Sequence, residues 1–125
     1  MPYSLQQDGG QLRITYTGTL RATELHESLD EADRLLAASA RWPDNLVDLR
    51  GVELSALGFA DLMSVAKRRE SITPPNPIRT AIVADSPTLM GFARMFQSLN
   101  HNPNITIRVF GDLDEAVTWL QEQPR

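Results

Sequence analysis

The chain has 125 residues, of which 42% are hydrophobic and 22% charged, and it contains no cysteine. We expect one soluble globular domain over residues 1–125, without disulfides, thiolate metal ligands or cysteine nucleophiles. The formal net charge of −4 argues against nucleic-acid binding, which depends on neutralising phosphates. No apolar run reaches the roughly 18 residues needed to cross a bilayer. Since Met1–Ser4 also lacks the pattern of a signal peptide, we expect a cytoplasmic location.

The first part of the chain has the pattern of a β-hairpin followed by a helix. Gly9-Gly10 separates a strand-like run over Tyr3–Gln7 from a second run over Leu12–Thr19, as in a hairpin turn. A helix is predicted over Thr23–Ala38, because apolar residues recur there at helical spacing and acidic residues fill its first turns.

Strands and helices alternate in the rest of the chain. The proline-rich segment Thr73–Pro77 must end a helix, because proline removes a donor and restricts the residue before it. The predicted elements are a strand over Leu46–Leu49, a helix over Ala56–Arg69, a strand over Arg79–Ala84, a helix with Ser86 as N-cap and Pro87 in its first turn, a strand over Ile105–Phe110, and a helix opened by Asp112 and Glu115. This order predicts an α/β domain in which an N-terminal β-hairpin joins a mixed sheet, with parallel later strands covered by helices.

The order and spacing of these elements resemble those of the SpoIIAA-like branch of the STAS domains, the fold group of anti-sigma-factor antagonists. The likeness is carried by the strand end Asp48–Val52 with the following helix start Ser55–Phe59, by the strand that ends at Asp85, and by the closing block Val109–Leu120. It implies a single STAS domain that acts as a non-enzymatic regulatory module, needs no cofactor, and binds a protein partner or a second copy of itself as a homodimer.

One position of that resemblance is changed in a way that affects function. In the antagonists the corresponding loop reads Asp-Ser-Ser-Gly-Leu, and a partner kinase phosphorylates the first serine. Here Ser55 stands at the acidic position, Ala56 at the phosphorylated position, and only Gly58 is kept. Because alanine cannot be phosphorylated, the resemblance implies a module without the phosphoserine switch. The alternative is that Ser55 replaces the phosphorylated serine from one residue earlier. The favoured prediction is that Ser55 is the N-cap of the second helix.

Residues at the carboxyl ends of the predicted parallel strands form the candidate site. Asp48, Asp85 and Asp112 are expected to meet at one edge of the sheet, where α/β domains bind ligands. Turn and cap roles are favoured for the last two. Asp48 lies within an apolar strand and is predicted to form, with Arg50, either an ion pair or a polar anchor for a ligand. The candidate interaction or ligand surface comprises Asp48, Arg50, Ser55, Ala56, Gly58, Phe59, Met63, Asp85, Ser86 and Met90.

No catalytic residue or metal ligand is predicted. His26 and His101 have no partner at the spacing of a triad or a metal site, and His26 is expected to be solvated. The basic cluster Lys67–Arg69 falls at the end of the second predicted helix, where cations complement the helix dipole. The alternative for this cluster is a patch that binds phosphate or an acidic partner.

The second and third predicted helices carry more apolar surface than one stripe requires. Leu57 and Val65 flank the inner face of the second, and Met90 and Met95 flank that of the third. Core packing is the favoured interpretation, with methionine filling gaps. The alternative is a pocket between these helices for a small apolar ligand or lipid, as in the CRAL-TRIO/SEC14 domains, which this topology distantly resembles. The alternative function is therefore a carrier or sensor.

Overall fold

The computed structural model describes residues 2–8 and 10–122, which form strands and helices in alternation after an N-terminal hairpin. The strands are β1 (Tyr3–Asp8), β2 (Gln11–Tyr16), β3 (Asp44–Asp48), β4 (Ile78–Val83) and β5 (Ile105–Phe110). The helices are α1 (Ala22–Leu36), α2 (Phe59–Glu70), α3 (Pro87–Ser98) and α4 (Leu113–Gln121). The five strands form one sheet in sequence order, with β1 antiparallel to β2 and all other neighbours parallel. The predicted α/β class and mixed sheet are confirmed.

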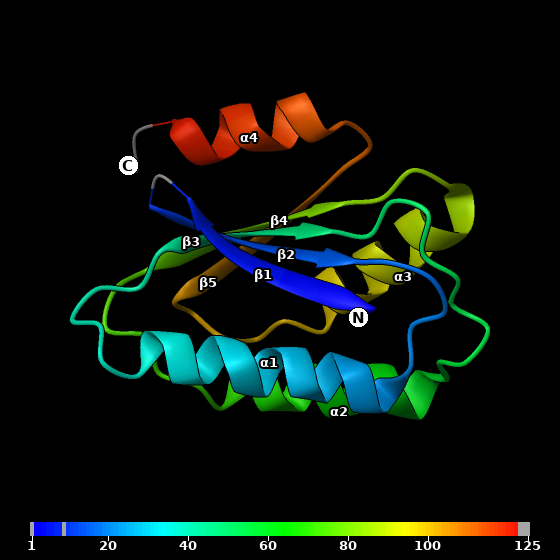
Figure 1. Ribbon diagram of the computed structural model, residues 1–125, viewed down its shortest axis with the longest axis horizontal. Coiled ribbons are helices and arrows are strands. Elements are labelled where there is room, and N and C mark those ends of the chain that lie inside the picture. The colour runs from blue at the N-terminus through cyan, green and yellow to red at the C-terminus, as the bar shows by residue number, and fades with distance from the viewer. Residues whose placement is uncertain (1, 9, 123–125) are drawn as a thin grey trace.

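The helices divide between the two faces of the sheet. Helix α4 alone covers one face, and α1, α2 and α3 lie on the other (Figure 1). Because successive residues of a strand point to opposite faces, Leu46 of β3 and Ala81 of β4 pack beneath α4. Their neighbours Asn45 and Thr80, which are partners in the register of β3 with β4, therefore face the three-helix side. Two buried polar residues thus lie next to each other on that face.

Several element boundaries differ from the predicted ones by a few residues. The second strand ends at Tyr16 rather than Thr19, because the chain turns at Gly18, whose φ of 70° lies in the left-handed region. Beyond that turn, Leu20 donates to the carbonyl of Glu53 and Glu53 donates to that of Gly18. Of the predicted Gly9-Gly10 turn, Gly10 has a φ of 85° and residue 9 lies outside the described residues.

The third and fourth helices begin where the sequence predicts. Ser86 is the N-cap of α3, with its side-chain oxygen accepting from Leu89 N at 3.2 Å and Pro87 in the first turn. Asp112 is the N-cap of α4 and accepts from Asp114 N at 2.7 Å. Both residues therefore satisfy backbone donors that a helix start would otherwise leave without partners.

Candidate functional site

The predicted pair of Asp48 and Arg50 is present at the carboxyl end of β3. The Arg50 guanidinium donates to both carboxylate oxygens of Asp48, from Nε at 3.0 Å and from Nη2 at 2.9 Å. The backbone N–H of Arg50 also donates to Oδ1 at 3.1 Å, and Arg13 of β2 approaches Oδ2 to 3.9 Å. Asp48 is buried, with 5% of its surface exposed. The pair therefore fixes the first turn after β3.

Charge and hydrogen bonding act in opposite directions on Asp48. Burial by itself would raise the pKa of its carboxyl. The hydrogen bonds from the side chain and backbone of Arg50, together with the charges of Arg50 and Arg13, outweigh burial and lower the pKa of Asp48 below its ordinary value. This carboxylate is therefore ionised and fully engaged at neutral pH, which makes it a structural anchor rather than a free ligand group.

The three aspartates predicted to share one edge of the sheet do so around Arg50. The hydrogen bond and charge of Asp48 raise the pKa of Arg50, and the charges of Asp85 and Asp112 act in the same direction. Asp85 accepts from the backbone N–H of Gly51 at 3.3 Å, and the carboxylate of Asp112 caps α4. Each carboxylate thus has a structural partner. No group of three or more metal-binding side chains occurs within residues 2–8 and 10–122.

The loop before α2 differs from the sequence-based prediction. Helix α2 begins at Phe59, not near Ala56, and its N-cap is Gly58 rather than Ser55. The carboxylate of Asp61 accepts from the backbone N–H of Gly58 at 2.9 Å, which stabilises the helix start three residues later than predicted. Ser55 and Ala56 occupy an exposed turn instead.

The remaining surface candidates surround this loop but do not form one pocket. The Phe59 side chain is 63% exposed at the first position of α2. Met63 and Met90 are half-buried, and Met90 packs against the main core. The exposed part of the predicted surface therefore lies mainly in the loop before α2 and at the first turn of that helix.

His26, which is expected to be solvated, is half-buried. Its ring lies between α1 and α2, with Nε2 3.3 Å from the hydroxyl of Ser64 and Nδ1 3.3 Å from Nη1 of Arg68. Arg68 also donates to Asp30 at 2.6 Å and to Asp33 at 2.9 Å. These contacts join the two helices, so one member of the basic cluster holds α2 against α1.

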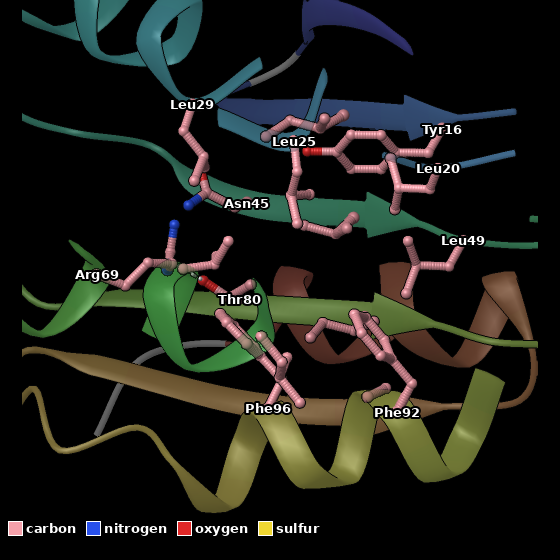
Figure 2. A pocket seen from close by; sticks show the side chains of 16 residues that line it. Tyr16, Leu20, Leu25, Leu29, Asn45, Leu49, Arg69, Thr80, Phe92 and Phe96 are labelled. Atoms are coloured by element: carbon pink, nitrogen blue, oxygen red, sulfur yellow. Dashed lines mark hydrogen bonds between the residues drawn. The ribbon is translucent and has the colours of Figure 1, made fainter. Parts of the chain in front are cut away.

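A cavity of about 70 Å³ lies between the sheet and the helices α1, α2 and α3. Its walls are mostly apolar, and strands β2, β3 and β4 form its floor (Figure 2). Leu62 and Val65 of α2 line it on one side, and Phe92, Ala93 and Phe96 of α3 line it on another. Val65 is thus the one flanking residue of the predicted inter-helix pocket that reaches the cavity, while Leu57, Met90 and Met95 do not line it.

One end of this cavity is polar. Arg69 of α2, Asn45 of β3 and Thr80 of β4 lie together at the left of Figure 2, opposite Leu20 and Leu49. Nη2 of Arg69 donates to the hydroxyl of Thr80 at 3.2 Å. Among the described residues, no atom forms a hydrogen bond with Nε of Arg69 or with Oδ1 of Asn45. Burial lowers the pKa of Arg69 below its ordinary value.

The end of α2 that carries Arg69 is held in place by Asn102, which is 5% exposed. The side-chain amide of Asn102 donates to the carbonyls of Arg69 at 3.0 Å and Ile72 at 2.8 Å, and its oxygen accepts from Asn104 N at 3.0 Å. The last carbonyls of a helix lack partners within the helix. Asn102 supplies one and thereby fixes the position of Arg69 over the sheet.

The polar end of the cavity is not evident from the sequence. Asn45 precedes the predicted strand by one residue, and Thr80 lies within an apolar strand. Their register, which makes them neighbours, depends on sheet pairing that the sequence does not show. The signal that was present is the basic cluster, because Arg69 turns inward whereas Arg68 binds aspartates and Lys67 is exposed.

The sheet order and the division of helices between its faces are those of a STAS-type domain. The SpoIIAA-like family model matches residues 11–121, so the chain belongs to the SpoIIAA-like family. Domains of this kind generally mediate protein interactions and are generally non-enzymatic. No helix within the described part of the chain has both the length and the apolar character needed to span a membrane.

Among solved structures, the chain is similar to an uncharacterized protein of the DUF3478 family with a SpoIIAA-like fold from Shewanella loihica. The two share 16% sequence identity and a TM-score of 0.60, over 94% of this chain and 91% of that chain. At this identity the similarity concerns the fold. Curated proteins show no significant match to the chain.

Proposed function

We propose that the cavity binds a small, largely apolar ligand, so that the domain acts as a ligand carrier or sensor. The observation that carries this proposal is the cavity of about 70 Å³ with mostly apolar walls and one polar end. Protein interiors contain few voids larger than a water molecule. At ~24 cal/mol per Å³, an empty cavity of this size costs roughly 1.5–2 kcal/mol of stability, which a bound ligand recovers.

The position of α2 supports a sensing role for this cavity. Leu62, Val65 and Arg69 of α2 line the cavity, and the same helix presents Phe59 to solvent at its first turn. Helix α2 is in contact with α1 and α3. A ligand that fills the space between α2 and the sheet therefore contacts the helix that carries the exposed surface.

Filling the cavity from α3 should abolish ligand binding without a loss of stability. Ala93 is fully buried and lines the cavity, so the three added carbons of Ala93→Leu occupy empty space. Methyl NMR of the wild-type chain titrated with 1-butanol should show saturable shifts at Leu62, Val65 and Ile82, and Ala93→Leu should show none. The free energy of unfolding of Ala93→Leu should stay within about 1 kcal/mol of wild type.

Ala116→Leu is the matched control. Ala116 is also fully buried, but it packs in the α4 core away from the cavity. The same substitution there should cost about 1–3 kcal/mol by overpacking and leave the butanol shifts unchanged. If the wild-type shifts do not saturate, or if they gather outside the cavity, the ligand function is wrong.

The second candidate function is protein binding through the loop before α2. Phe59 favours it, because a large apolar side chain with 63% of its surface in solvent is a typical anchor for a partner. Ser55, Ala56 and Gly58 are exposed beside it. Since Ala56 offers no hydroxyl, a partner would bind without a phosphorylation switch at this position. A second copy of the chain is the other expected partner at this surface. The cytoplasmic location stays a prediction.

Phe59→Asp should remove partner binding while leaving the fold intact. Because the side chain is exposed, the change in unfolding free energy should stay within about 0.5 kcal/mol. Leu35→Asp on α1 is the control, since Leu35 is another exposed apolar side chain at a distance in the sequence from the loop. Sedimentation velocity across protein concentrations reports self-association. A dimer that persists in Phe59→Asp, or a variant that unfolds, contradicts the proposed surface.

A further inference from the structure

The polar end of the cavity contains a cation, Arg69, that makes no direct ion pair, although the charge of Asp33 acts on it from a greater distance. No carboxylate within residues 2–8 or 10–122 forms an ion pair with Arg69 at 4.0 Å or less. Its neighbour Arg68, by contrast, forms ion pairs with Asp30 and Asp33. Buried charges in proteins are normally paired, because an unpaired charge loses its hydration without compensation. The Arg69 side chain as a whole is half-buried, but its Nε is buried, so the guanidinium can take a partner that the described residues do not supply.

The groups around Arg69 have the geometry of a receptor for an anion. The side chains of Asn45 and Arg69 turn toward each other from β3 and α2 (Figure 2). Asn45 is 5% exposed and Thr80 is 2% exposed, so both are shielded from bulk solvent. Nε of Arg69 is a donor without a described partner, and the hydroxyl of Thr80 and the amide nitrogen of Asn45 are further donors, whereas the unpartnered atom of Asn45 is the acceptor Oδ1.

Water molecules alone would meet only part of this demand. A water bridge satisfies hydrogen-bonding atoms at little cost, but it leaves the positive charge of Arg69 without a counter-charge in direct contact. Burial disfavours the charged form of this guanidinium, which lowers the pKa of Arg69. A ligand carboxylate supplies the counter-charge as well as the acceptors, in the geometry that arginine recognises.

We propose that the cavity binds a short-chain monocarboxylate, with its carboxylate at Arg69, Asn45 and Thr80 and its alkyl chain toward Leu20 and Leu49. This inference rests on the proposed ligand function and adds the class of ligand. On the measure by which one water molecule needs roughly 10–15 Å³, the cavity volume of about 70 Å³ accommodates a carboxylate with a few carbons. The apolar far end excludes a second charged group.

Three probes of equal chain length test the charge selection directly. Butyrate, 1-butanol and butylammonium are titrated separately into the wild-type chain at pH 7, with methyl NMR following Leu62, Val65 and Ile82. Butyrate should bind about tenfold more tightly than 1-butanol, and butylammonium should produce no saturable shift. Because this comparison uses the unmodified chain, it decides the proposal whether or not a variant folds.

Substitution of the arginine identifies the group responsible. Arg69→Met should remove the preference for butyrate over 1-butanol while both still bind, and Arg69→Lys should keep part of it. Arg68→Met is the matched control and should retain the full preference, because Arg68 lies outside the cavity. A preference that survives in Arg69→Met overturns the assignment of the carboxylate to this residue.

The outcomes separate the two proposals. Equal binding of butyrate and 1-butanol in the wild-type chain refutes the carboxylate inference and leaves the ligand function standing. If 1-butanol gives saturable shifts and butyrate does not, the carboxylate inference is likewise refuted and the ligand function stands. If neither butyrate nor 1-butanol gives saturable shifts at the cavity, the proposed ligand function fails, and this inference fails with it.

Discussion

Replacing Asp48 by asparagine should lower the free energy of unfolding by about 2 kcal/mol at pH 7, which urea denaturation measures directly. Asp48 is buried and accepts three hydrogen bonds from Arg50. Hydrogen bonds to a charged group each contribute about 1.5–3 kcal/mol. The expected total is smaller than their sum, because the Arg50 side chain is 43% exposed and water screens the pair.

The effect of Asp48→Asn should also depend on pH. The pKa of Asp48 is lowered in the folded chain relative to about 3.9 in the unfolded chain, so the ionised carboxylate stabilises the folded state. This contribution is fully present above the unfolded pKa and is lost as pH falls through the lowered folded pKa. The stability difference between wild type and Asp48→Asn should therefore be constant from pH 7 to pH 5 and then shrink toward pH 2.

Asp85→Asn provides the control for this prediction. Asp85 lies at the same edge of the sheet but is exposed, and its single hydrogen bond from Gly51 N is 3.3 Å long. Its substitution should change the unfolding free energy by less than about 0.5 kcal/mol. If the difference in unfolding free energy between wild type and Asp48→Asn stays constant down to pH 2, the shape of the Asp48 side chain, and not its charge, stabilises the fold.

Arg69→Met should make the ligand-free protein more stable, by about 1–2 kcal/mol. The substitution removes the charge of a half-buried side chain whose Nε is buried and which makes no direct ion pair, and replaces it with an apolar chain of similar length. This net gain already allows for about 1 kcal/mol that is lost with the hydrogen bond to Thr80. For a chain of this length a net gain of about 1–2 kcal/mol corresponds to a rise in the unfolding midpoint of roughly 4–8 °C.

The neighbouring arginine should respond with the opposite sign. Arg68→Met removes ion pairs with Asp30 and Asp33 at the surface between α1 and α2. Exposed pairs of this kind are worth up to about 1 kcal/mol, so Arg68→Met should be slightly less stable than wild type. Differential scanning calorimetry without ligand compares the two variants. If Arg69→Met loses as much stability as Arg68→Met, the charge of Arg69 is already balanced within the ligand-free protein, which contradicts the prediction.

A substitution that stabilises the ligand-free protein but weakens ligand binding is typical of a functional residue. Natural sequences retain unfavourable groups where activity needs them. If Arg69 binds a ligand carboxylate, its cost in the empty protein is recovered when the ligand is present. Butyrate should accordingly raise the unfolding midpoint of wild type and leave that of Arg69→Met nearly unchanged.

The fold was predictable because its signals are local. Alternating polarity, the prolines between α2 and β4, and the serine and proline at the start of α3 each indicate an element without reference to distant residues. The predicted strand Ile105–Phe110 agrees with β5 at both ends. The start of α2 was predicted three residues early, because Asp61 and Gly58 stabilise a later start than Ser55 would.

The site was predictable only where its residues are close in sequence. Asp48 and Arg50 are two residues apart, and their ion pair was predicted as one of two roles. Arg69, Asn45 and Thr80 come from three elements, and only the packing of α2 over the register of β3 with β4 brings them together. The contacts of His26 are not evident from the sequence, because its partners Ser64 and Arg68 lie on another helix.

A crystal structure of the wild-type chain grown with butyrate tests the central claim most directly. We expect butyrate within the cavity, with its carboxylate oxygens within hydrogen-bond distance of the Arg69 guanidinium and its alkyl chain against the apolar wall. The same experiment on Ala93→Leu should show no butyrate there. Ordered water alone at Arg69, or butyrate bound only on the outer surface of the wild-type chain, would contradict the account.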